Sequence, residues 1–145
     1  MSQHNTAMIY VETFTMKNQG GRISAICGEL HYPGTDSSCV SVLGTNDCTL
    51  AAVAETARLL ESLKARGKNP MEIQVKVYTT NNQLIWGWKD FQDASPQKHK
   101  QQWKRLINIS KCYQSVEIEG AGILSRTVKE KAKFLLLRRL KNNEK

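Results

Sequence analysis

Tryptophan and lysine residues interleave between positions 86 and 105, and this combination of side chains suits contact with a polyanion. Aromatic rings can stack on bases or sugars, while neighbouring cations contact phosphates. Tryptophan also buries well in a core, and we predict that position for Trp103, whereas the role of Trp88 stays open. The candidate residues for nucleic-acid binding are Trp88, Lys89, Lys98, Lys100, Lys104 and Arg105.

Positive charge is concentrated in the last third of the chain. Residues 1–90 carry eight Lys and Arg and eight Asp and Glu, whereas residues 91–145 carry thirteen and five, which accounts for the net charge of +8. Such an excess attracts polyanions, of which nucleic acid is the commonest and an anionic membrane a weaker second. A solvated helix face with a soluble tail is the alternative explanation.

Other kinds of site find little support in the sequence. The four cysteines form no C-x-x-C pair and the three histidines have no ligand spacing, so we expect free thiols and no zinc site. No run approaches the ~20 apolar residues of a transmembrane helix, and the first residues lack the features of a secretory signal. We therefore expect a cytoplasmic protein, with residues 1–145 forming one domain and 141–145 a disordered tail.

The periodicity of the sequence predicts the elements that position these residues. Alternating runs predict strands over 8–15, 22–30, 39–43, 72–77 and 115–119. Helical spacing predicts helices over 50–66, 95–110 and 125–140, and residues 81–88 form a short helix or turn that Gly87 interrupts. This order implies an α/β fold with a five-stranded mixed sheet, of three antiparallel strands followed by alternating strands and helices, flanked by helices.

Several local motifs, in this order, resemble the ribonuclease H family. They are the strand Ile9-Tyr10-Val11-Glu12-Thr13, Gly44-Thr45-Asn46-Asp47 followed by Ala54-Glu55, Val77-Tyr78-Thr79-Thr80, Gly87-Trp88-Lys89, and Trp103-Lys104-Arg105-Leu106. The resemblance covers nearly the whole chain and implies a ribonuclease H-like fold. Family members hydrolyse the RNA strand of RNA–DNA hybrids with two divalent metals, so the resemblance also implies a carboxylate site for Mg²⁺ or Mn²⁺.

This chain matches the family's carboxylate positions only in part. Glu12 stands at the first position, and Glu55 at the second, although an ungapped match would put Ala52 there. The third position falls on Thr80, whose neutral oxygen can ligate a metal without offsetting its charge. The implied metal ligands are therefore Glu12, Glu55 and Thr80.

The fourth carboxylate position falls on Lys133, where an ammonium group would repel divalent ions or replace one of them. Glu130 lies three residues earlier and could substitute for the missing acid. The family's histidine between the last strand and helix has no counterpart in residues 120–122.

Three functions follow as hypotheses. The first is a module that binds RNA–DNA hybrid or duplex RNA, with hydrolysis impaired. The second is an active metal-dependent nuclease with Glu12, Glu55 and Glu130 as its catalytic acids, which requires these acids to converge. The third is a protein-interaction scaffold whose basic surface meets an acidic protein partner.

Overall fold

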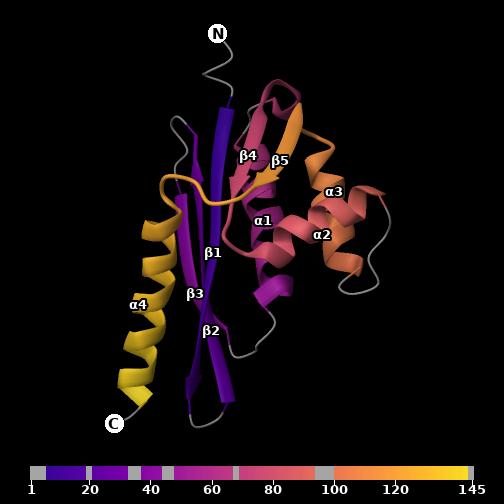
Figure 1. The fold of residues 1–145 in the computed structure, drawn as a ribbon. Coiled ribbons are helices and arrows are strands. Elements are labelled where there is room, and N and C mark those ends of the chain that lie inside the picture. Colours follow the sequence, from indigo (N-terminus) through magenta and orange to yellow (C-terminus); the bar gives the residue numbers. More distant parts are fainter. Residues whose placement is uncertain are drawn as a thin grey trace.

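The computed structural model describes residues 6–18, 21–32, 37–43, 48–66, 69–93 and 100–143, and it places helices on both faces of one sheet (Figure 1). Its elements, in chain order, are β1 (Thr6–Asn18), β2 (Gly21–His31), β3 (Ser37–Leu43), α1 (Cys48–Ala65), the 3-10 helix η2 (Pro70–Glu72), β4 (Gln74–Tyr78), α2 (Asn82–Asp93), α3 (Lys100–Ser110), β5 (Ser115–Glu119) and α4 (Ser125–Asn143).

The strand order in the sheet is β3-β2-β1-β4-β5, which makes β1 the central strand. β1 pairs antiparallel with β2 and β2 antiparallel with β3, whereas β4 runs parallel to β1 and β5 parallel to β4. Because side chains alternate between the faces of a strand, the odd residues of β1 meet one helical layer and the even residues meet the other.

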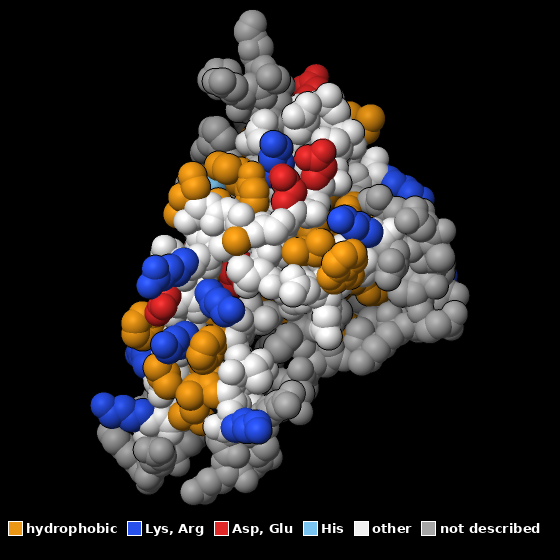
Figure 2. All heavy atoms as spheres, in the orientation of Figure 1, with side chains coloured by type: hydrophobic (Ala, Val, Ile, Leu, Met, Phe, Trp, Pro, Cys, Tyr) orange, Lys and Arg blue, Asp and Glu red, His pale blue; other side chains and the backbone are white. Residues whose placement is uncertain are grey.

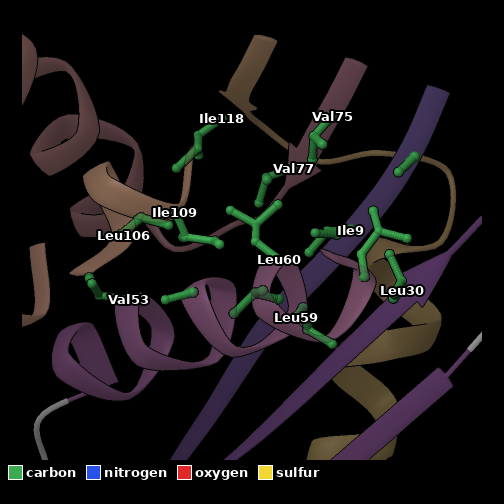
Figure 3. Close-up of a cluster of buried hydrophobic side chains, with 14 of the residues drawn as sticks. Ile9, Leu30, Val53, Leu59, Leu60, Val75, Val77, Leu106, Ile109 and Ile118 are labelled. Carbon is green, nitrogen blue, oxygen red and sulfur yellow. The ribbon is translucent and has the colours of Figure 1, made fainter. Parts of the chain in front are cut away.

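One face of the sheet carries the larger hydrophobic core. Ile9 and Val11 of β1 and Val75 and Val77 of β4 pack with α1, and α2 and α3 complete this layer. Figure 3 shows Leu59 and Leu60 of α1 directed toward the sheet, with side chains of α3 beside them. Burial of this set accounts for the helical spacing in residues 50–66.

Among the described helices, α4 is the one that covers the other face (Figure 1). Val128, Ala132 and Leu136 form the buried stripe of this helix and pack on Tyr10 and Cys27. This smaller core leaves room for buried polar groups, and Glu12 and Glu29 both lie in it at 0% and 4% exposure.

Two predicted helix boundaries were wrong. Gly87 does not interrupt the short helix, since α2 continues through it to Asp93. A Cβ at Gly87 would lie 2.3 Å from the ring of Trp103, so the glycine allows α3 to pack closely on α2. The last helix extends to Asn143, so Lys141 belongs to the helix and not to a disordered tail.

Some sequence predictions fall outside the described residues, including the Gly44–Asp47 motif and the Ser95-Pro96 helix start. Cys27 and Cys112 have free thiols, as predicted. None of the described helices has the length and apolar character needed to span a membrane.

Candidate functional site

Glu12 lies in the middle of β1 and faces α4. Its even-numbered neighbour Tyr10 belongs to the α4-side core, and its partner on β2 is Cys27, which belongs to the same core. The side chain is fully buried. Glu12 is therefore part of the interior between the sheet and α4 and not a surface residue.

Thr80 supplies the main hydrogen bonds to Glu12. The Thr80 backbone N–H donates to both carboxylate oxygens, at 3.1 and 2.9 Å, and its hydroxyl donates to Oε1 at 2.5 Å. β4 runs parallel to β1 and ends at Tyr78, so the chain just beyond β4 passes beside Glu12. The resemblance had placed Glu12 and Thr80 at neighbouring site positions, and the structure brings them together.

The first turn of α4 also contacts the Glu12 carboxylate. The Ser125 hydroxyl also hydrogen-bonds to the Glu12 carboxylate, and it accepts the backbone N–H of Gly122 at 2.8 Å. Burial raises the pKa of the Glu12 carboxyl, while the bonds from Thr80 and Ser125 and the charge of Lys129 act in the opposite direction. The net result is a carboxyl with a raised pKa.

The lysine of α4 whose charge acts on Glu12 is Lys129, one helical turn before the predicted Lys133. Lys133 instead lies over the ring of Phe14, with Nζ 5.8 Å from the ring centroid. An ammonium group of α4 thus acts on Glu12, and it belongs to Lys129; the assignment of Lys133 to the fourth carboxylate position stays a prediction.

Glu130 does not join this site. It lies two residues from both Val128 and Ala132, and those residues face the sheet. On a helix, a residue offset by two from each of two buried positions lies on the opposite side. Glu130 therefore points away from Glu12, which contradicts the convergence that the second hypothesis requires.

Glu55 lies on the other face of the sheet. A Cβ at Gly28 would come within 2.3 Å of Oε2 of Glu55, so the glycine makes room for this carboxylate. Gly28 pairs with Val11, which faces the α1-side core, whereas Glu12 faces α4. Arg58 holds the carboxylate through two bonds, at 2.8 and 2.6 Å.

These side chains do not fit a pair of divalent metal ions. Two divalent ions held side by side need several carboxylates whose oxygens coordinate both of them. The cluster around Glu12 instead offers one carboxylate, two hydroxyls and an ammonium group. Across the described ranges, no three Asp, Glu, His or Cys side chains gather as a ligand set.

A second buried acid, Glu29, was missed in the sequence. Lys131 of α4 donates a hydrogen bond to Oε2, and the His31 ring lies 2.9 Å from Oε1. Burial acts to raise the pKa of Glu29, but the hydrogen bonds and charges of Lys131 and His31 outweigh it and hold the pKa below its usual value. The Glu29 and His31 spacing on one strand was the available signal, because residues two apart share a face.

The candidate nucleic-acid contacts are dispersed. Trp88 is 6% exposed and packs in the core. Its ring is therefore not available to stack on a nucleic acid, and the prediction that Trp88 contacts nucleic acid is wrong. Trp103 is buried, as predicted. Arg105 is held by Glu61 through bonds of 2.8 and 2.5 Å. Lys98 and the side chain of Lys100 lie outside the described residues, and Lys89 and Lys104 are exposed.

The arrangement of five strands and flanking helices is shared with solved ribonucleases H. LC11-RNase H1 from compost matches with a TM-score of 0.68 at 14% identity, covering 94% of this chain and 99% of that one. The same enzyme in complex with an RNA/DNA hybrid matches at 0.65, with 13% identity and coverage of 87% and 92%. The chain has a ribonuclease H-like fold.

A more remote bacterial structure supports the same ribonuclease H-like fold. The N-terminal RNase H domain of rv2228c from Mycobacterium tuberculosis matches with a TM-score of 0.62 at 7% identity, covering 86% of this chain and 95% of that one. Neither protein-family models nor curated protein sequences match the chain. This ribonuclease H-like domain is thus divergent in sequence, and its site must be judged from its own residues.

Proposed function

We propose that this ribonuclease H-like domain binds RNA–DNA hybrid or another nucleic-acid duplex and hydrolyses it weakly or not at all. The state of Glu12 carries the proposal. Its carboxylate is buried and already accepts hydrogen bonds from Thr80, with Lys129 adding positive charge nearby. Two-metal hydrolysis needs acidic oxygens that are free to hold ions, and this cluster does not offer them.

The binding half of the proposal is supported by charge and fold. The chain carries a net charge of +8, and Figure 2 shows Lys and Arg side chains spread over one face, with several over the region of α4. Duplexes with RNA strands are held mainly through phosphates, 2′-hydroxyls and groove shape. A solved protein with this fold, LC11-RNase H1, is in complex with an RNA/DNA hybrid.

The decisive experiment follows cleavage and binding on the same samples. An end-labelled RNA–DNA hybrid is incubated with the protein in Mg²⁺, Mn²⁺ or EDTA, and each sample is divided between a denaturing gel and a binding shift. We expect a shifted but intact hybrid, and an affinity that falls steeply with salt. Lys104→Ala should weaken binding, whereas Lys17→Ala, a matched exposed lysine on β1, serves as the control.

Two other results would replace this proposal. Metal-dependent cleavage that is lost in Glu12→Ala and Glu55→Ala, but not in the exposed control Glu72→Ala, would mean that the domain is an active nuclease with rearranged acids. Absence of affinity for any duplex at low salt would instead favour a protein-interaction scaffold with an acidic partner.

A further inference from the structure

The strand β5 forms one edge of the sheet, and β4 is its neighbour there (Figure 1). Just before β5, the N–H of Gln114 donates to the carbonyl oxygen of Ile73 at 3.0 Å, and this bond also lies on the β4 side. Among the described residues, no backbone group outside β4 pairs with residues 115–119. An edge of this kind presents a row of N–H and C=O groups with which a further extended chain can pair.

A groove lies at the start of this edge. It has a volume of about 430 Å³, and Val116 of β5 lines it together with Trp88 of α2 and Ile107 of α3. The groove therefore lies where the helical layer meets the edge of the sheet. Neighbouring strands place paired side chains on the same face, so a side chain paired with Val116 would enter this groove. Lys111 also lines it, and its charge disfavours a basic side chain at that position.

The opposite face of β5 carries acidic side chains. Side chains alternate along a strand, so Ile118 is buried on the helical face, whereas Glu117 and Glu119 are exposed on the other. On β4, Lys76 is the neighbour of Glu117 and Tyr78 that of Glu119. Within the part of the chain that the structure describes, neither carboxylate forms a salt bridge. A chain with a net charge of +8 thus keeps negative charge at this edge.

These two carboxylates distinguish between possible occupants of the edge. A nucleic acid brings phosphates, which the carboxylates repel, and it has no row of amide groups that could pair with a strand. A second copy of the chain that paired through its own β5 would place acids beside Glu117 and Glu119, and like charges on neighbouring strands destabilise the pair. An extended peptide with basic side chains suits both the backbone and the charge.

We propose that the β5 edge is a docking site for an extended segment of a basic protein, which adds a strand to the sheet. Backbone hydrogen bonds to residues 115–119 hold the segment. Its lysine or arginine side chains lie beside Glu117 and Glu119, and an apolar side chain between them fills the groove next to Val116. This site lies on β5 and does not rest on the nucleic-acid binding proposed above.

A synthetic peptide tests the docking site in the absence of nucleic acid. The peptide has blocked ends and lysine at every second position, with threonine between the lysines and a single central leucine as the anchor. Added to isotope-labelled protein, it should shift the amide NMR resonances of residues 115–119 and slow the hydrogen exchange of the amides on the outer side of β5. The same peptide with glutamate in place of lysine should shift none of them.

Two changes to the peptide separate strand addition from simple charge attraction. One pair of peptides carries N-methyl groups either at the lysines or at the residues between them, so that only one member of the pair loses the N–H groups that face β5. That member should lose binding, and the other should keep it. Replacement of the leucine by glycine should weaken binding about tenfold, because the groove is then left unfilled.

A charge reversal in the protein tests the acidic face. Glu117→Lys should weaken binding of the lysine peptide about fivefold, because it replaces an attractive cross-strand pair by a repulsive one. Glu130→Lys makes the same change on α4, which packs on β1, β2 and β3, and should bind the peptide like the wild type. Neither glutamate is buried, so both variants should fold. Binding of an RNA–DNA hybrid should not weaken in either variant.

The docking site and the proposed function fail separately. Unchanged β5 resonances at millimolar peptide, equal effects of the two N-methylations, or equal weakening by Glu117→Lys and Glu130→Lys would each refute the docking site and leave hybrid binding untouched. A dimer of the free protein whose outer β5 amides already exchange slowly would make a second copy the occupant and also overturn it. Absence of affinity for the hybrid at low salt would refute the proposed function alone.

Discussion

Two buried glutamates on the same face of the sheet have opposite environments. Glu12 on β1 receives hydrogen bonds from Thr80 and Ser125, which are neutral, and its pKa is raised by burial. Glu29 on β2 lies diagonally across from it and pairs with Lys131 and His31, so its pKa is lowered. Both carboxylates are covered by α4, but of the two only Glu29 forms salt bridges with its hydrogen-bond partners.

The difference separates a structural ion pair from an altered site. A buried carboxylate with cationic partners remains ionised, and it ties the helix to the sheet. A buried carboxylate whose direct partners are neutral donors keeps a pKa raised by burial, and its oxygens are already engaged by those donors, which makes it a poor ligand for hard cations. Acidic residue type alone therefore predicts neither role, and the charge of the neighbours decides between them.

Removal of Glu12 should have the largest effect. Glu12→Ala leaves a cavity and removes the acceptor of the partly buried N–H of Thr80, so we expect a loss of about 2–4 kcal/mol in the free energy of unfolding. Urea denaturation followed by circular dichroism measures it. Glu12→Gln, which keeps an acceptor and cannot ionise, should change stability by less than about 1 kcal/mol, and equal losses in both variants would contradict this account.

A second acid beside Glu12 should make the cluster sensitive to metals. Thr80→Asp places a carboxyl against Glu12, and repulsion should lower the melting temperature without added metal. Addition of Mn²⁺ should recover at least part of this loss, because two carboxylates then share one cation. The same titration should leave the wild-type melting temperature unchanged, and an equal shift in both proteins would show that Thr80 is not what limits metal binding.

The ion pair of Glu29 should appear as a pH dependence of stability. Glu29→Gln should lower the free energy of unfolding by about 1–2 kcal/mol at pH 7, because its carboxylate loses Lys131 and His31. Since the folded pKa lies below the usual 4.5, the wild-type advantage is complete above that value and is lost as the pH falls through the lowered pKa. A difference that did not begin to shrink as the pH fell below 4.5 would contradict the ion-pair explanation.

The smallest effect is expected on the other face of the sheet. Gly28→Ala must displace the Glu55 side chain, and because that side chain is flexible the cost should be about 1 kcal/mol. Glu55→Ala should remove most of this cost in the double variant, as a thermal-denaturation cycle would measure. Additive losses would mean that the two residues do not meet.

Much of the fold was predictable because local patterns agreed with the final packing. Alternation in residues 8–15 located β1 and hence Glu12, and the spacing of Val128 and Ala132 identified the buried stripe of α4. The relation between Glu12 and Thr80 could be reached only through the family resemblance, because these residues lie far apart in the sequence and meet through parallel pairing of β1 and β4.

The remaining errors concern which face a side chain takes. Trp86 and Trp88 are two residues apart on α2, and only the packing of α2 decides which ring is buried. Lys129 and Lys133 lie on the same side of α4 one turn apart, so the helical pattern does not distinguish them. Glu55 contacts Gly28 because α1 packs on that face of β2. This contact depends on the tertiary packing and cannot be predicted from the sequence around either residue.

The hydrogen bonds between Glu12 and Thr80 also set an order of events during folding. The two residues are 68 positions apart, whereas the β1–β2 hairpin is local and closes early. In a chain that has emerged only as far as β3, Glu12 is still hydrated, and its carboxylate is ionised at neutral pH. Glu12 loses its water only when β4 and α4 pack around it, because Thr80 follows β4 and Ser125 and Lys129 belong to α4. Burial of a carboxylate in an early strand therefore waits for elements made much later in the chain.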